Sequence, residues 1–313
     1  MNKESNKQCN TQRNTQRINK YQKKATVAAI LAAVLYALNA PFSKMLLKEV
    51  SETMMAAWLY IGAGFGMSVL WIIRNKKNHN ASQLHITKKE LPYTIGMVVL
   101  DIMAPIFLMI GLDRTTAANA SLMNNFEIVA TSIIALVIFN EKISKRLWYG
   151  IGLITFACIL LSMQDQGSLQ FSLGSIFVLF ACICWGLENN CTRVLSEKDP
   201  MQIVIIKGFG SGIGSLLIAL VTRNTVPHFM YVLCAMGLGF VAYGLSIFFY
   251  VYAQRYLGAA RTSAYYAVSP FIGGILSLIL YRQLPSVVFV IALLFMALGV
   301  YFASIREKAS KQE

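Results

Sequence analysis

Four ionisable side chains lie well inside apolar stretches of this 313-residue chain, where a charge is costly. They are three acids and one base, Asp101, Glu127, Glu188 and Lys207. A charged side chain at the centre of a lipid bilayer costs about 2.5–3.5 kcal/mol on insertion scales, so it must face protein or a water-filled cavity. These residues are therefore the first candidates for binding an ionic substrate or carrying a proton.

Glu127 lies near the middle of the apolar run 120–139, which can cross a bilayer because about 20 residues are enough. Asn124, Glu127 and Thr131 are spaced three and four residues apart, so they share one helical face with Ser121. The opposite face is apolar and can contact lipid. We therefore expect other helices to surround this polar stripe.

Composition indicates an all-α integral membrane protein. Hydrophobic residues make up 56% of the chain and charged residues only 13%, whereas a soluble domain carries about 25% charged residues. Apolar runs of nearly membrane-spanning length recur along the chain, and we expect ten transmembrane helices. Their expected bounds are about 25–47, 52–73, 91–111, 116–139, 147–163, 173–194, 201–221, 229–253, 262–281 and 287–305.

The polar ends of the chain are expected to lie outside the membrane. Residues 1–24 are rich in Asn, Gln and Lys, which predicts a disordered basic tail, and residues 307–313 form a second short tail. With the N-terminus in the cytosol, 22 of the 28 Lys and Arg residues lie on the cytosolic side and Lys207 lies within the membrane. The outer loops hold the other five, Lys44, Lys48, Arg114, Arg223 and Arg282.

This asymmetry follows the positive-inside rule and places both termini in the cytosol. It also explains the net charge of +14 without nucleic acid as a partner, because most of the basic residues lie in alternate short loops.

The two halves of the chain repeat. Small and polar residues of the first half recur in the second at offsets between 142 and 149 residues; the matches are Tyr36 with Trp185, Asn39 with Glu188, Ser43 with Thr192, Lys44 with Arg193, Gly62 with Gly210, Gly64 with Gly212, Gly66 with Gly214, and Ser121 with Ser263. Each half has five expected spans, an odd number, so the two copies must enter the membrane from opposite sides. This predicts two inverted five-helix repeats, residues 25–165 and 166–306, as in many secondary transporters.

A sequence signature in the expected fourth span resembles a known family. The stretch Ala117-Ala-Asn-Ala-Ser-Leu-Met-Asn-Asn-Phe-Glu-Ile, followed by Asn140-Glu-Lys-Ile-Ser, is similar to the fourth-helix signature of the EamA family of the drug/metabolite transporter superfamily. That signature has small residues, a mid-helix Glu-Pro and a Glu at the helix end. Glu127 and Glu141 match the two acids, whereas Ile128 replaces the proline.

The second copy keeps the proline as Pro270 but has Gln283 at the place of the helix-end Glu. The resemblance covers nearly the whole apolar chain. It implies a secondary-active or facilitative transporter of a small metabolite, amino acid or drug-like molecule, acting by alternating access in the cell (plasma) membrane. It also favours export as the direction of transport.

The four buried charges suggest two functional pairs. Glu188 and Lys207 are expected at similar depth on helices joined by a short loop, so they should form an ion pair that either holds the helices together or also binds substrate. Asp101 and Glu127 are expected near the middle of adjacent spans. Two carboxylates in a low dielectric disfavour joint ionisation, which makes each a candidate proton carrier. The alternative is a neutral acid that hydrogen-bonds within a helix contact.

Aromatic and polar side chains on the same stripes are candidates to line a substrate cavity, because Tyr and Trp suit an amphiphilic or aromatic molecule. Packing in the core or against lipid is the alternative for each. The predicted cavity residues are Tyr36, Asn39, Asn124, Trp185, Glu188, Lys207, Tyr243 and Tyr266.

No catalytic, metal or cofactor site is expected. The three histidines lie in loops, no phosphate-binding Gly-Lys motif is present, and the six cysteines suit reduced thiols rather than a disulfide set. An intramembrane enzyme would need a nucleophile and a base at matched depth, for which Ser246 or Cys184 is a thin basis. A non-transporting membrane sensor or assembly partner is the remaining alternative. The expected partners are thus a small-molecule substrate, the lipid bilayer and, as a coupling ion, protons.

Overall fold

The computed structural model describes residues 21–77, 87–139, 144–164, 172–195, 198–257, 262 and 265–304, and its regular structure in these ranges is helical. The predicted tails before residue 21 and after residue 304, and the helix-end acid Glu141, lie outside the described residues. Residues 21–24, which the sequence analysis assigned to the tail, are helical and extend the first span.

Within the described ranges, nine helical stretches are long and apolar enough to cross a membrane. They are Tyr21–Leu46, Glu52–Arg74, Lys88–Arg114, Ala117–Ile138, Lys145–Met163, Leu173–Thr192, Pro200–Val221, Phe229–Gln254 and Val287–Ser304. The predicted ninth span, 262–281, contains the shorter apolar helix α13 (Ser269–Leu280). The regular structure of these ranges is therefore all helical, with the helix lengths and composition of a multi-pass membrane protein.

The helices follow the predicted spans closely. After residues 21–37 of the first span, their bounds are α2 (Asn39–Leu46), α3 (Glu52–Lys77), the 3-10 turn η1 (Lys88–Glu90), α4 (Leu91–Arg114), α5 (Ala117–Met123), α6 (Phe126–Phe139), α7 (Lys145–Gln164), α8 (Leu173–Leu195), α9 (Pro200–Val221), α10 (Phe229–Gly239), the π-helical η2 (Phe240–Leu245), α11 (Ser246–Leu257), α13 and α14 (Val287–Ser304).

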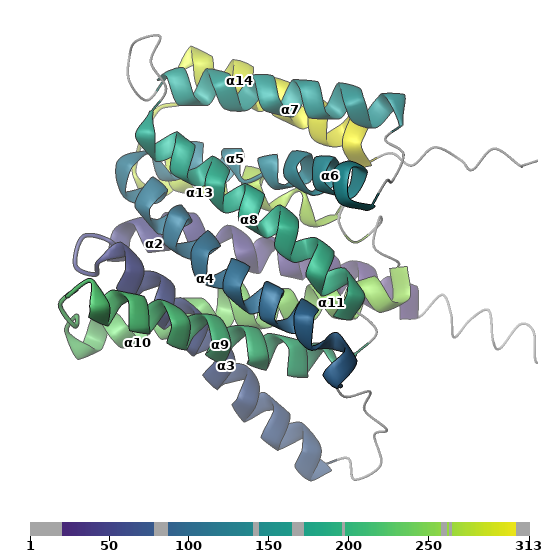
Figure 1. Cartoon of the computed structure of the whole chain (residues 1–313). Helices are drawn as coiled ribbons and strands as arrows, with labels where there is room; N and C mark the ends of the chain where they lie inside the picture. The colour runs from purple at the N-terminus through teal and green to yellow at the C-terminus, as the bar shows by residue number, and fades with distance from the viewer. Residues whose placement is uncertain are drawn as a thin grey trace, which may run out of the picture.

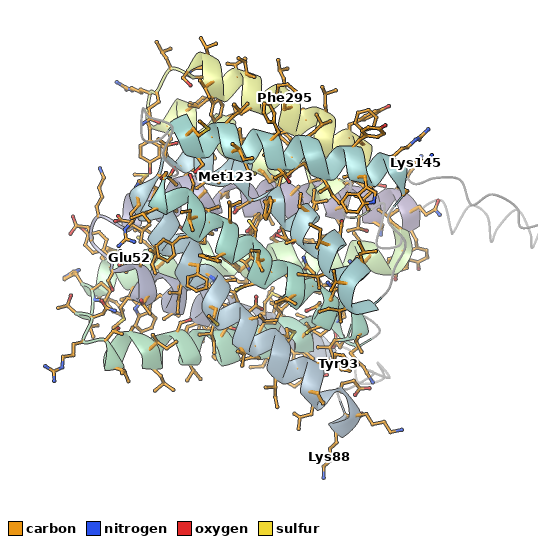
Figure 2. The ribbon with its side chains drawn as sticks, turned by 45° about the horizontal axis from the view of Figure 1, so that its top comes forward. Glu52, Lys88, Tyr93, Met123, Lys145 and Phe295 are labelled. Carbon is orange, nitrogen blue, oxygen red and sulfur yellow. The ribbon has the colours of Figure 1, made fainter. Side chains whose placement is uncertain are left out.

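The helices run back and forth along one bundle axis (Figure 1). Glu52 lies toward one end of the bundle, and Lys88 and Lys145 lie toward the other (Figure 2). The main packing partners are α3 with α9, α4 with α8, and α7 with α14. Many large apolar side chains remain exposed around the bundle, such as Val137 and Leu217, as expected of a surface that contacts lipid.

Glycine permits the closest of these helix contacts. A Cβ atom added at Gly208 of α9 would lie 2.4 Å from the Cα of Gly64 in α3, and a Cβ at Gly212 would lie 2.7 Å from the backbone nitrogen of Ile61. Small residues at helix interfaces let backbones approach in membrane proteins, where packing drives association. These glycines thus allow the close contact between α3 and α9.

The fourth span is interrupted between α5 and α6, although it lacks the family's proline. The backbone N–H of Asn125 donates to Leu122 O at 3.1 Å, and that of Ile128 donates to Asn125 O at 3.0 Å. These bonds reach back three residues instead of four, so the α-helical ladder gives way to a tight turn. A turn at residues 267–268, directly before α13, lies near the place that the predicted repeat pairs with this interruption.

Candidate substrate cavity

A cavity of about 580 Å³ lies within the bundle and borders both helix interruptions. This volume falls in the range of about 300–1,000 Å³ that is typical of small-molecule sites. Its lining consists of Tyr36, Tyr60, Asp101, Asn124, Asn125, Glu127, Ile128, Thr131, Ser132, Trp185, Glu188, Asn189, Thr192, Lys207, Tyr243, Ile247, Tyr250, Val251, Gln254, Tyr266, Ala267 and Pro270.

The structure therefore brings the predicted cavity residues together, with one exception. Asn39 does not line the cavity but lies behind it: its Nδ2 donates a hydrogen bond to the hydroxyl of Tyr243 at 2.9 Å, and Ser43 Oγ donates to its Oδ1 at 3.0 Å. Helical periodicity assigned Asn39 to the correct face of its helix, but the larger side chain of Tyr243 lies between Asn39 and the cavity. Asn39 thus orients a cavity tyrosine.

Lys207 lies between two carboxylates. Its Nζ atom is 2.9 Å from Glu188 Oε1, as the sequence predicted, and 3.1 Å from Asp101 Oδ2. The hydroxyl of Tyr60 donates to the other oxygen of Asp101 at 3.2 Å, and the hydroxyl of Thr192 donates to Glu188. The network joins α3, α4, α8 and α9, so one lysine connects helices from both halves of the chain.

Asp101 was not expected in this network. The sequence analysis grouped it with Glu127, yet its described partners are Lys207 and Tyr60. The contact arises because α4 packs along α8, which brings Asp101 to the ion pair between α8 and α9. In the sequence, the only signal for this contact was the expected depth in the membrane. Asp101, Glu188 and Lys207 all lie within about three helical turns of a predicted cytosolic loop.

Glu127 has a different environment. Its Oε1 atom accepts a hydrogen bond from Asn189 Nδ2 at 2.6 Å, and the same amide lies 3.4 Å from Thr131 Oγ1. Within the described part of the chain, Glu127 forms no ion pair. Its carboxyl group is therefore held by a neutral donor and lies against the cavity.

A continuous row of tyrosine rings follows the cavity wall. Tyr60 contacts Tyr243 with 4.9 Å between ring centroids, Tyr243 contacts Tyr36 at 5.9 Å, Tyr36 contacts Tyr266 at 5.5 Å, and Tyr266 contacts Tyr250 at 4.9 Å. We call these five residues the tyrosine row. Sequence analysis selected only Tyr36, Tyr243 and Tyr266 for the cavity; no periodicity links residues so distant in sequence.

Two asparagines at the α5–α6 interruption carry polar atoms without a hydrogen-bond partner among the described residues. They are Asn124 Oδ1 and Asn125 Nδ2, and both side chains are more than nine-tenths buried. Buried polar groups are nearly always paired in folded proteins. Both residues line the cavity through other atoms, because Asn124 Oδ1 and Asn125 Nδ2 are themselves covered.

A bundle of apolar helices around a buried, charged cavity is the architecture of a membrane transporter. The chain belongs to the EamA-like transporter family, whose sequence profile matches residues 23–163 and again residues 172–305. The family predicted from the fourth-span signature is thus confirmed, and the chain is a multi-pass membrane protein.

Two relatives carry transporter names. An "Uncharacterized transporter" of Methanothermobacter thermautotrophicus is 25% identical over 85% of this chain and 82% of its own length. The "Uncharacterized transporter YyaM" of Bacillus subtilis is 22% identical over 81% of this chain and 85% of its own length. The family and these relatives' names indicate transporters rather than enzymes.

A solved structure described as "Crystal structure of protein" shares the fold. Its TM-score is 0.66 at 15% sequence identity, and the match covers 92% of this chain and 98% of that one.

Proposed function

We propose that this protein moves a small organic molecule across the cell membrane by alternating access, as a secondary-active or facilitative transporter. The observation that carries the proposal is the charged cavity bordered by the α5–α6 interruption and the turn before α13. Substrate sites of many secondary transporters lie near the bilayer midplane between discontinuous helices of two repeats. Export is the direction that the family resemblance favours, and the substrate class includes metabolites, amino acids and drug-like molecules.

The proposal includes ten spans arranged as two inverted five-helix repeats, residues 25–165 and 166–306, with α13 in the ninth span. The glycine contacts support this symmetry. A Cβ at Gly62 would meet Met236 of α10, and a Cβ at its sequence equivalent Gly210 would meet Val98 of α4. The second and seventh spans therefore make matching contacts with the eighth and third. The two matches to the family profile, one in each half, agree with the repeat.

The cavity extends toward the ends of the bundle that carry the basic loops. Thr131, Thr192 and Gln254 line it, and each lies in the part of its helix that leads to a loop predicted to be cytosolic. With both termini in the cytosol, as the positive-inside rule predicts, this arrangement corresponds to an inward-facing state.

Hydrogen bonds close the opposite end. Lys44 Nζ donates to the backbone oxygens of Leu112 and Asp113, each at 2.6 Å, and the hydroxyl of Tyr281 donates to Pro41 O at 2.8 Å. These contacts join the first span to the third and the ninth. We propose that they break when the cavity opens to the outside.

Protons are the proposed coupling ion, with Glu127 and Asp101 as the candidate carriers. Glu127 suits this role better, because Asp101 is paired with Lys207 whereas Glu127 contacts a neutral amide. A carboxyl group without a fixed cation can gain or lose a proton without breaking an ion pair.

Flux in proteoliposomes tests the proposal. The purified protein is reconstituted, and efflux of radiolabelled amino acids, amines, nucleobases and sugars is compared with protein-free vesicles. Saturable efflux of at least one compound is expected, and Lys207→Met should reduce it. Binding of these compounds without any movement would instead support a membrane sensor or assembly partner.

A further inference from the structure

We propose that the substrate is an organic monocation, a protonated amine attached to an aromatic ring, whose nitrogen binds at Glu127 while its ring packs on the tyrosine row. This inference rests on the proposed transport function and names its substrate class. It is carried by two features of the cavity, its charges and its aromatic wall.

The charges of the cavity favour a cation. Among the described residues, its lining holds three acids and one base, Lys207. The lysine is 5% exposed and contacts both Asp101 and Glu188, so its positive charge is already shared between two carboxylates. Glu127 is left as the acid whose described contact is a neutral amide, Asn189. An ammonium group is the ligand that neutralises this carboxylate.

The aromatic wall supplies the second contact. Glu127 lines the same cavity as Tyr36 and Tyr266 of the tyrosine row. Aromatic faces attract a cation within about 6 Å of the ring centroid, and they also stack on an apolar ring. A molecule with both groups can use the carboxylate and the row at once.

The same arrangement disfavours a substrate carboxylate. An anion in this cavity would meet a net negative lining, and the single lysine could bind it only by releasing Asp101 or Glu188. Removing a partner from a buried ion pair is strongly unfavourable. An amino acid should thus bind less tightly than the amine that lacks its carboxyl group.

Isothermal titration of the purified full-length protein with three related probes tests this order. The probes are 2-phenylethylamine, L-phenylalanine and 3-phenylpropionate, which share a ring and differ in charge. The amine should bind at least about tenfold more tightly than the amino acid, and the acid should bind most weakly. Glu127→Gln should weaken amine binding at least about tenfold, because the amide keeps the shape but loses the charge. The matched control is Glu49→Gln, the same change at an exposed site outside the cavity.

A second pair of variants keeps the test decisive if Glu127→Gln fails to fold. Tyr36→Leu should weaken binding about threefold or more, and Tyr36→Phe should weaken it less, since it retains the aromatic face. Equal binding of the amino acid or the acid, or wild-type affinity in a folded Glu127→Gln protein, would overturn the inference.

Flux separates the two proposals. An amine that binds but is not moved contradicts transport, whereas saturable flux of another class of compound without amine binding contradicts only the substrate assignment.

Discussion

The ammonium nitrogen of Lys207 lies 3.1 Å from Asp101 Oδ2, and this contact turns a pair of buried charges into a triad with Glu188. A two-residue pair could be replaced by two neutral residues at little cost. In the triad, replacing one charged residue changes the net charge around the other two. The first prediction follows from this difference.

Lys207→Met should destabilise the protein strongly, because it leaves two carboxylates buried without their cation. The loss of a buried partner typically costs about 3–5 kcal/mol. Combining Lys207→Met with Glu188→Gln should restore only part of the melting temperature, since Asp101 still lacks its cation. Adding Asp101→Asn should restore most of the rest. Full recovery in the double variant would show that Asp101 does not share the lysine.

The same series separates structure from binding. If the triad is only structural, the triple variant should regain both its melting temperature and its flux. If the charges also bind substrate, stability should recover while flux stays low. A mutant cycle on both measurements gives the coupling between the residues.

Gly208→Ala should weaken the contact between α3 and α9. The new Cβ would lie 2.4 Å from the Cα and the backbone nitrogen of Gly64, so the helices must separate. Overpacking of this kind costs about 1–3 kcal/mol. Thermal unfolding in detergent measures the effect. Gly237→Ala is the control, since an added Cβ there meets no atom within 4 Å, and its melting temperature should stay close to that of the wild type.

The orientation of the chain can be tested with single cysteines in a Cys-free variant. Thr225→Cys lies in an exposed loop predicted to be outside, and Lys89→Cys lies at an exposed site predicted to be cytosolic. An impermeant thiol reagent should label position 225 in intact cells and position 89 only after permeabilisation. The reverse pattern would invert the topology.

Lys44→Met should favour opening of the cavity to the outside, because it removes two hydrogen bonds from the closed end of the bundle. In a Cys-free variant carrying Thr131→Cys, a membrane-impermeant reagent should label the cavity faster from outside when Lys44 is replaced. Lys48→Met, a matched change at an exposed site in the turn after α2, is the control. Equal labelling rates in the two would argue against Lys44 as part of the closure.

Glu127→Gln should abolish the dependence of transport on the pH gradient if Glu127 carries the coupled proton. The glutamine oxygen can still accept the hydrogen bond that Asn189 donates, so the fold should be retained. Flux is measured in proteoliposomes with and without an imposed gradient. Wild-type flux that ignores the gradient would instead describe a facilitator.

The sequence by itself determined the membrane character, the family and most of the helix bounds. An apolar run of about 20 residues is long enough to cross a bilayer, and each run can be recognised from its own residues without knowledge of its neighbours. Helical periodicity also placed Tyr36, Trp185 and Glu188 on the faces that line the cavity. The Glu188–Lys207 pair could be predicted because the two residues lie on consecutive helices at similar depth.

Only the tertiary structure decided which distant side chains meet. Asp101 joins Lys207 because α4 packs along α8, and Asn39 is hidden behind Tyr243 because a tyrosine ring reaches further than an amide. The fourth span is interrupted without the family's proline, through backbone bonds at Asn125 that no sequence rule requires. Periodicity assigns a face within one helix, whereas the contacts between helices depend on rotation and packing, which are set by the whole bundle.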